Sequence, residues 1–218
     1  MTSTEARTVA FMDMGTHSMR LLLVRIHPDY SYTILTQLKQ MVRLGDGAFT
    51  HRHLQPDAID RAVCVARQFA QLARANGADD IITVATAATR EAENQGVFEQ
   101  RLQQEAALDV RVVSGFEEAR LIYLGVASGV HLGEKQAFFM DIGGGSTEVI
   151  IGTQHRHSYL GSLKLGAIRL TAQFFADESG PVAPQKYEAI QRYVRHHAVR
   201  TLREIGRASC RERVYVLV

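Results

Sequence analysis

The spacing of hydrophobic positions changes several times along the chain, and each change predicts a different element. Apolar residues run almost without interruption through 8–15 and 18–26, which predicts two strands joined by a tight turn at 15–17. Over residues 56–76 the apolar positions recur on one helical face, and Gly77 is a suitable stop signal. The chain is therefore expected to begin with a strand hairpin and a helix.

The rest of the chain alternates between the same two periods. Further strands are expected at residues 31–38, 80–88, 109–113, 136–143 and 147–152. Further helices are expected at residues 92–106, 115–127, 165–176 and 184–203. Strands alternating with helices indicate an α/β fold.

One internal repeat organises the chain. FMDMGTHSMRLLL (11–23) aligns without gaps on FMDIGGGSTEVII (139–151). A chance match of short apolar strands explains the hydrophobic positions, but it does not explain Asp, Gly and Ser at identical spacing. The repeat therefore predicts a duplicated hairpin that binds phosphate.

The turn of the second copy has the chemistry of an anion site. Three consecutive glycines are expected to let the backbone turn with positive φ and approach a ligand closely. Successive N–H groups in such a turn form a concave site for an anion. The candidate phosphate contacts are Gly143, Gly144, Gly145, Ser146 and Thr147.

Two carboxylates flank this turn. Asp141 and Glu148 would repel phosphate, so a cation is expected between them and the ligand, and Mg²⁺ suits oxygen ligands of this kind. An ordinary glycine-rich hairpin turn would leave both carboxylates unexplained. The loop is not a Walker loop, because no Gly-Lys-Ser/Thr follows it.

The first copy of the turn differs in charge. Arg20 stands where the second copy has Glu148, and its guanidinium can contact phosphate oxygens in a fork, although it would also suit an ordinary surface. Asp13 matches Asp141 and is a further candidate ligand for Mg²⁺. The other candidate phosphate contacts here are Gly15, Thr16, His17 and Ser18.

Several segments resemble one known family. Together with the two loops, RLGDG (43–47), ATAATREAEN (85–94), VVSGFEEARLIYLGV (112–126) and LGAIRLT (165–171) resemble the exopolyphosphatase/guanosine pentaphosphatase (Ppx/GppA) family of the actin-like ATPase superfamily. The resemblance covers residues 8 to about 200. It implies two RNase H-like α/β domains with a phosphate-binding cleft between them, the first at 1–130 and the second, incomplete, at 131–203.

The resemblance also implies residue roles. Glu118 matches the family's general base, and a carboxylate in that role orients a water molecule and accepts its proton. Glu117 instead fits an acidic helix N-terminus. Thr89 and Arg90 match a segment that borders the phosphate channel, where Arg90 is a candidate phosphate contact. His17 stands where the family usually has Asn, which affects phosphate affinity rather than reaction type.

The expected function is the release of terminal phosphate from inorganic polyphosphate or guanosine pentaphosphate (pppGpp), with Mg²⁺. The sequence does not separate the two substrates, because both end in the same group. A kinase of the same superfamily, a non-catalytic sensor of phosphate chains or alarmone, and an inactive fragment remain as alternatives.

Composition limits the partners. The formal net charge is +2 over 218 residues, so no global basic field indicates nucleic acid. No apolar run is long enough for a bilayer and no signal peptide is recognisable, so a cytoplasmic protein without a membrane partner is expected. The two cysteines, Cys64 and Cys210, form no framework, and Cys64 is expected in a helix core. A homodimer of the full-length protein remains open.

The C-terminal stretch is unusual. EIGRASCRERV (204–214) resembles the in-frame translation of a common sequencing adapter, although an ordinary basic helix is an alternative. We therefore expect residues 204–218 to be a doubtful, non-native tail and the chain to be truncated.

Overall fold

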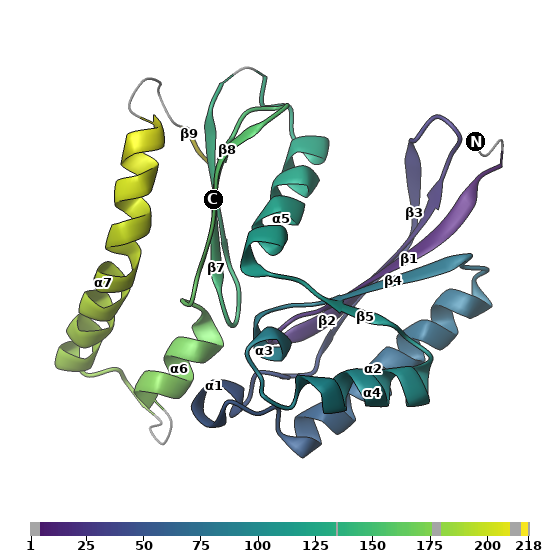
Figure 1. Cartoon of the computed structure of the whole chain (residues 1–218), viewed down its shortest axis with the longest axis horizontal. Helices are drawn as coiled ribbons and strands as arrows, with labels where there is room; N and C mark the ends of the chain where they lie inside the picture. Colours follow the sequence, from purple (N-terminus) through teal and green to yellow (C-terminus); the bar gives the residue numbers. More distant parts are fainter. Residues whose placement is uncertain (1–4, 134, 176–179, 210–214, 218) are drawn as a thin grey trace. The chain divides into compact units, whose positions relative to one another are not determined.

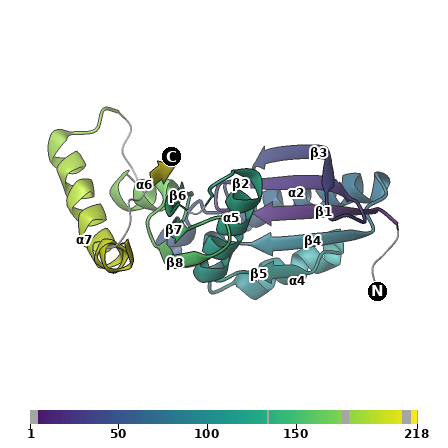
Figure 2. The ribbon, with the colours of Figure 1, turned by 90° about the horizontal axis from the view of Figure 1, so that it is seen from above.

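The computed structural model describes residues 5–133, 135–175, 180–209 and 215–217 (Figures 1 and 2). It divides into two compact units, Met1–Val113 and Ser114–Val218. We expected the first unit to extend to about residue 130. The division falls earlier because the helix that begins at Gly115 packs on strands of the second unit. No helix among the described residues has the length and apolar character that a membrane span requires.

Unit 1 contains a five-stranded sheet in the order β3-β2-β1-β4-β5. The first three strands are antiparallel, and β4 and β5 run parallel to β1. The strands are β1 (Arg7–Met14), β2 (Ser18–Ile26), β3 (Tyr32–Met41), β4 (Asp80–Ala85) and β5 (Val110–Val112). The helices are α1 (Ala48–His51), α2 (Pro56–Ala75), α3 (Ala87–Arg90) and α4 (Gln95–Ala106).

The core of unit 1 lies between this sheet and α2 with α4. Pro56 begins α2 at a position where its missing N–H costs nothing, and Gly77, at φ +72°, follows its end. The face of α2 that contains Val63 packs on β-strand residues such as Met12 and Leu21, which are at most 1% exposed. Cys64 is exposed on the other side of α2, so its expected place in the core was wrong.

Unit 2 contains a four-stranded sheet in the order β8-β7-β6-β9. Its strands are β6 (Ala137–Ile142), β7 (Thr147–Gly152), β8 (His157–Leu163) and β9 (Tyr215–Leu217). Its helices are α5 (Gly115–Gly129), α6 (Ala167–Phe175) and α7 (Pro184–Ser209). Alternate strand residues face opposite sides of the sheet. One side packs on α5, through Ala119, Tyr123, Phe139 and Ile150.

The other side of this sheet faces α6 and α7. Met140, Ile142 and Val149 line an apolar cavity of about 310 Å³ there, together with Leu170 of α6 and Val194 of α7. Ile142 remains 68% exposed. This side of the sheet is therefore less well packed than the matching side of unit 1.

The duplication extends beyond the hairpin. Each unit adds a third antiparallel strand, then a Leu-Gly pair and the start of a helix, and each has a later strand parallel to its first (β4 or β9). The Leu-Gly pairs are Leu44–Gly45 and Leu165–Gly166. The expected duplicated α/β fold is confirmed. The doubtful tail stays a prediction: residues 204–209 continue α7, β9 pairs with β6, and 210–214 lie outside the described residues.

Candidate phosphate-binding site

The two hairpin turns have the same geometry. Gly15 N donates to Ser18 O at 3.1 Å, and Gly143 N donates to Ser146 O at 2.9 Å. The strands on either side are also in the same register. Asp13 lies opposite Arg20 on β1 and β2, as Asp141 lies opposite Glu148 on β6 and β7. The sequence repeat is therefore a repeat in space.

The glycines of the second turn have ordinary backbone angles, and two of them lie close to another backbone segment. None of Gly143–Gly145 is among the glycines with positive φ, so the expected left-handed turn was wrong. Gly144 and Gly145 lie against Gly166, where an added Cβ would come within 2.5 Å of Gly144 O and 2.5 Å of the Gly145 carbonyl carbon. The close approach of two backbones accounts for glycine at position 166.

The carbonyls of this loop are turned toward α6. They accept hydrogen bonds from the start of that helix: Ala167 N to Gly143 O (3.0 Å), Ile168 N and Arg169 N to Gly144 O (2.9 and 3.1 Å), and Arg169 Nε to Gly145 O (2.7 Å). In a planar trans peptide the C=O of one residue and the N–H of the next point in opposite directions. The N–H groups of Gly144, Gly145 and Ser146 therefore point away from α6, as an anion-binding row requires.

The two side chains that follow the glycines are both largely buried. Ser146 is 5% exposed and Thr147 is 8% exposed. The Thr147 hydroxyl donates to Leu165 O, and its side chain lies with Val149 on the cavity side of the sheet. The hydroxyl hydrogen of Thr147 thus helps to hold the segment before α6 beside the loop.

A row of polar side chains crosses the opposite side of the sheet. Asp141, Glu148 and Ser162 are cross-strand neighbours and therefore share one side, the side that packs on α5. Asp141 is exposed, whereas Glu148 is 2% exposed and accepts a hydrogen bond from Ser162 Oγ at 2.7 Å. Sequence reasoning missed Ser162 because it placed no strand over β8.

Glu118 belongs to the first turn of α5, the helix that packs on this sheet face. The C-terminal half of α5 is fixed at the β7–β8 turn, because Tyr123 Oη donates to Thr153 O at 3.0 Å and Gln154 Nε2 donates to Ala127 O. The N-terminal half of α5 consequently extends toward the opposite end of β7, where the glycine loop lies (Figure 1).

The neighbouring residue, Glu117, makes contacts within the first turns of α5. Its N–H donates to the Ser114 hydroxyl at 3.1 Å in an N-terminal cap, and its carboxylate contacts Arg120 Nη1 at 3.4 Å. The contact with Arg120 and the position in the first turn of α5 account for an acidic side chain here, as the sequence suggested. Glu118 stays the candidate general base that the family resemblance implies.

In unit 1 the loop is held by the segment after β3. Gly45 N donates to Thr16 O at 2.8 Å, and the N–H groups of Val42 and Arg43 donate to His17 O at 3.1 and 2.9 Å. Thr16 is 4% exposed, and His17 Nδ1 is buried without a hydrogen-bond partner in the described part of the chain. Arg20 is exposed, and Gly15 and Ser18 are half-buried.

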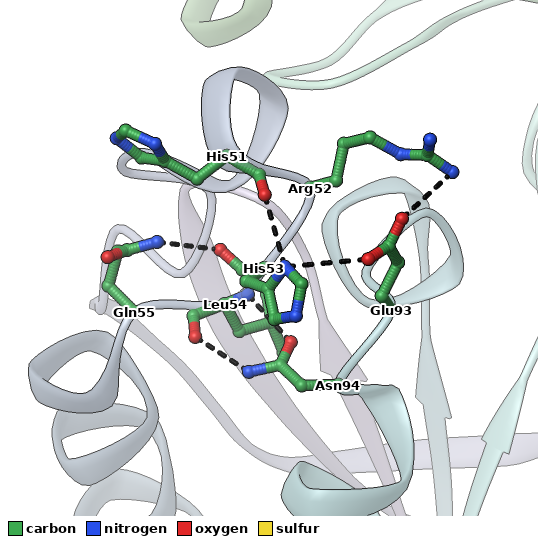
Figure 3. A network of polar contacts seen from close by, with 7 residues as sticks. All are labelled: His51, Arg52, His53, Leu54, Gln55, Glu93 and Asn94. Carbon is green, nitrogen blue, oxygen red and sulfur yellow. Dashed lines mark hydrogen bonds and ion pairs between the residues drawn. The ribbon is translucent and has the colours of Figure 1, made fainter.

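Arg90 and Thr89 lie on α3 in the same unit. Arg90 Nη1 donates to Val113 O at 2.8 Å, and Thr89 is fully buried. Figure 3 shows how the segment after α3 is tied to the segment before α2: Asn94 bonds the backbone of Leu54 in both directions, at 2.8 and 2.9 Å. These bonds fix the connection that follows Arg90.

The candidate metal ligands fall in both units. Asp13 belongs to unit 1, and Asp141 and Glu148 belong to unit 2. Among the described residues, no group of three or more His, Cys, Asp or Glu side chains is arranged to hold a metal ion. Any ion held by Asp141 and Glu148 would therefore draw further ligands from water or from a bound phosphate.

The fold and the paired loops define a duplicated α/β protein with two equivalent hairpins. A family model, that of the Ppx/GppA phosphatase family, matches residues 23–214. The chain belongs to the Ppx/GppA phosphatase family.

Solved structures agree with this assignment. The chain resembles an exopolyphosphatase from Cytophaga hutchinsonii at 30% identity and a TM-score of 0.87, over 92% of this chain and 63% of that one. It also resembles the Aquifex aeolicus member of the Ppx/GppA family at 27% identity and a TM-score of 0.71, over 90% of this chain and 63% of that one. The chain thus spans less than two thirds of the length of these relatives.

Proposed function

We propose that the protein to which this chain belongs hydrolyses the terminal phosphate of a phosphate chain, either inorganic polyphosphate or pppGpp. The observation that carries the proposal is the arrangement within unit 2. The glycine loop, the carboxylates of Asp141 and Glu148, and the α5 terminus that contains Glu118 lie toward one end of one sheet. Membership of the Ppx/GppA phosphatase family and the similarity to an exopolyphosphatase support the same reaction class.

The residues of unit 2 have separate roles, in phosphate binding and in proton transfer. The N–H groups of Gly144, Gly145 and Ser146 bind oxygens of the terminal phosphate. Glu118 accepts a proton from a water molecule as the water oxygen attacks the terminal phosphorus. The bond from that phosphorus to the bridging oxygen breaks, and orthophosphate and a chain shorter by one phosphate leave. In unit 1, Arg20 binds phosphate oxygens through its guanidinium.

The carboxylates of Asp141 and Glu148 suit a hard cation. They lie side by side on neighbouring strands, and Ser162 orients the buried Glu148 by donating to Oε1. Mg²⁺ bound there would neutralise charge on the phosphates, because this ion takes one or two carboxylates and fills its other positions with water and phosphate oxygens. Asp13 of unit 1 stays a separate prediction as a metal ligand.

The test measures the rate at which the full-length protein releases orthophosphate from polyphosphate and from pppGpp. Each substrate is assayed with Mg²⁺ and with excess chelator. We expect release that requires Mg²⁺ and is lost in Glu118→Gln. Binding without release in the full-length protein would favour a non-catalytic sensor. Phosphate transfer from ATP to a small acceptor would favour a kinase. Full activity in chelator would eliminate the role of the metal.

A further inference from the structure

The third carbonyl of the phosphate loop is held differently in the two units. The repeat pairs His17 with Gly145. In unit 1, His17 O accepts from the backbone N–H groups of Val42 and Arg43, at 3.1 and 2.9 Å. In unit 2, Gly145 O accepts instead from a side chain, Arg169 Nε, at 2.7 Å. One guanidinium thus occupies the place of two backbone donors.

The direction of this carbonyl matters for the ligand. Because the peptide is planar and trans, fixing Gly145 O also fixes the Ser146 N–H on the opposite side. Gly145 is buried, so its carbonyl would otherwise lose a hydrogen bond that water cannot replace. The loop could then rotate this peptide and turn the Ser146 N–H away from the anion.

Arg169 is well placed to fix the direction of the loop carbonyls. Its backbone N–H donates to Gly144 O at 3.1 Å, so the same residue holds two consecutive loop carbonyls, one through its backbone and one through its side chain. Its side chain is half-buried, which limits the number of rotamers that it can adopt. The segment LGAIRLT therefore holds two consecutive carbonyls of the loop.

We propose that Arg169 is a positioning residue that sets the direction of the Ser146 N–H and so the affinity of the loop for phosphate. The inference rests on the proposed function, because it assumes that the loop binds phosphate. The essential group is the N–H donor at the Nε position, and the positive charge of the guanidinium is secondary.

Three substitutions at Arg169 distinguish the effect of its N–H donor from the effect of its positive charge. Gln places a neutral N–H donor the same number of bonds from Cα as Arg Nε, so Arg169→Gln keeps the hydrogen bond. Arg169→Met has similar length and no donor. Arg169→Lys keeps the charge but places its donor one bond farther away. Arg192→Gln, at an exposed arginine of α7, is the matched control.

The experiment measures binding of tripolyphosphate to the whole chain at fixed Mg²⁺, by calorimetry and by backbone amide NMR. In the wild-type chain and in Arg192→Gln we expect the ligand to shift the amide signals of Gly144, Gly145 and Ser146. Arg169→Gln should keep these shifts. Arg169→Met should bind about tenfold more weakly, as expected when the Ser146 N–H no longer donates a hydrogen bond to the charged phosphate, and its Ser146 shift should shrink.

The outcomes separate the two proposals. A wild-type chain without any shift would overturn phosphate binding by the loop and this inference with it. Wild-type shifts that Arg169→Met reproduces at equal affinity would overturn the inference alone. If Arg169→Met does not fold, the comparison of Gln with Lys decides: stronger binding by Gln supports the donor role, and equal or stronger binding by Lys overturns it.

Discussion

Glu117 and Glu118 are adjacent in the sequence and differ in their surroundings. The backbone N–H of Glu117 donates to Ser114 in the N-terminal cap of α5, and the Glu117 carboxylate contacts Arg120. Glu118 lies one residue further on, at a helix end directed toward the glycine loop. Two residues of the same type can therefore be compared at almost the same position.

Replacing the two glutamates should give unequal losses. Glu118→Gln is expected to lower kcat of the full-length protein by about 10²–10⁴-fold with nearly unchanged substrate binding, because a positioned general base contributes that much. Glu117→Gln should change kcat far less. Steady-state kinetics with polyphosphate checks both variants. Equal losses, or a loss confined to KM, would show that the base was assigned wrongly.

Substitutions of Arg20 and of Asp141 should impair activity in different ways, because the two side chains have opposite charge. Arg20→Ala is expected to raise KM, with a loss that depends on salt, since it removes a cation near a polyanion. Asp141→Ala should instead raise the Mg²⁺ concentration needed for half-maximal activity. Titrations of substrate, salt and Mg²⁺ distinguish the two. A common phenotype that added Mg²⁺ leaves unchanged would contradict separate roles.

At the scale of elements, the sequence predicted the segments that have a strong apolar pattern or belong to the repeat. The two hairpins could be predicted from their apolar runs and from the repeat, and α2 from its helical period. β8 could not, because HSYLGSL has polar residues and a glycine in an only partly buried strand. The role of Gly166 was also hidden, since it depends on a contact with a loop that is distant in the sequence.

Two short connections of unit 1 are held together by Asn94. Asn94→Ala removes both of its bonds to Leu54 and leaves buried backbone groups without partners, so we expect about 1–3 kcal/mol of lost stability. Arg52→Ala is the matched control. It breaks only the ion pair with Glu93, in which the side chains are 74% and 50% exposed, and should cost at most about 1 kcal/mol.

Urea unfolding of both variants provides the measurement, with the midpoint and the slope compared with those of the wild type. A loss for Arg52→Ala that matched the loss for Asn94→Ala would mean that exposed charge, rather than the bonds to Leu54, holds these connections.

At the scale of the whole molecule, the two units differ in how well their cores are filled. Met12 and Met14 of unit 1 are at most 1% exposed, whereas the matching Met140 and Ile142 of unit 2 are 43% and 68% exposed. The cavity beside α6 and α7 belongs to the same poorly packed side. Unpaired apolar surface of this kind lowers local stability.

Unit 2 of this chain should therefore open before unit 1. Limited proteolysis with thermolysin, which cleaves beside apolar residues, is expected to cut first within residues 137–209 and to leave a resistant fragment that contains β1 to β5. Mass spectrometry of the fragments over time identifies the cuts. Equal rates of cleavage in both units, or a persistent fragment from unit 2, would contradict the expected order.

Gly45 and Gly166 occupy the same place in the two units. The folding defects of Gly45→Ala and Gly166→Ala should nevertheless differ in whether a second substitution can suppress them. A Cβ at Gly45 would come within 2.3 Å of Thr16 Cγ2, a side-chain methyl group, whereas a Cβ at Gly166 would meet the backbone of Gly144 and Gly145. In a library scored by a folding reporter, Thr16→Ser should restore Gly45→Ala, because it deletes that methyl group. No single side-chain replacement should restore Gly166→Ala, and a strong suppressor there would show that the loop backbone can move aside.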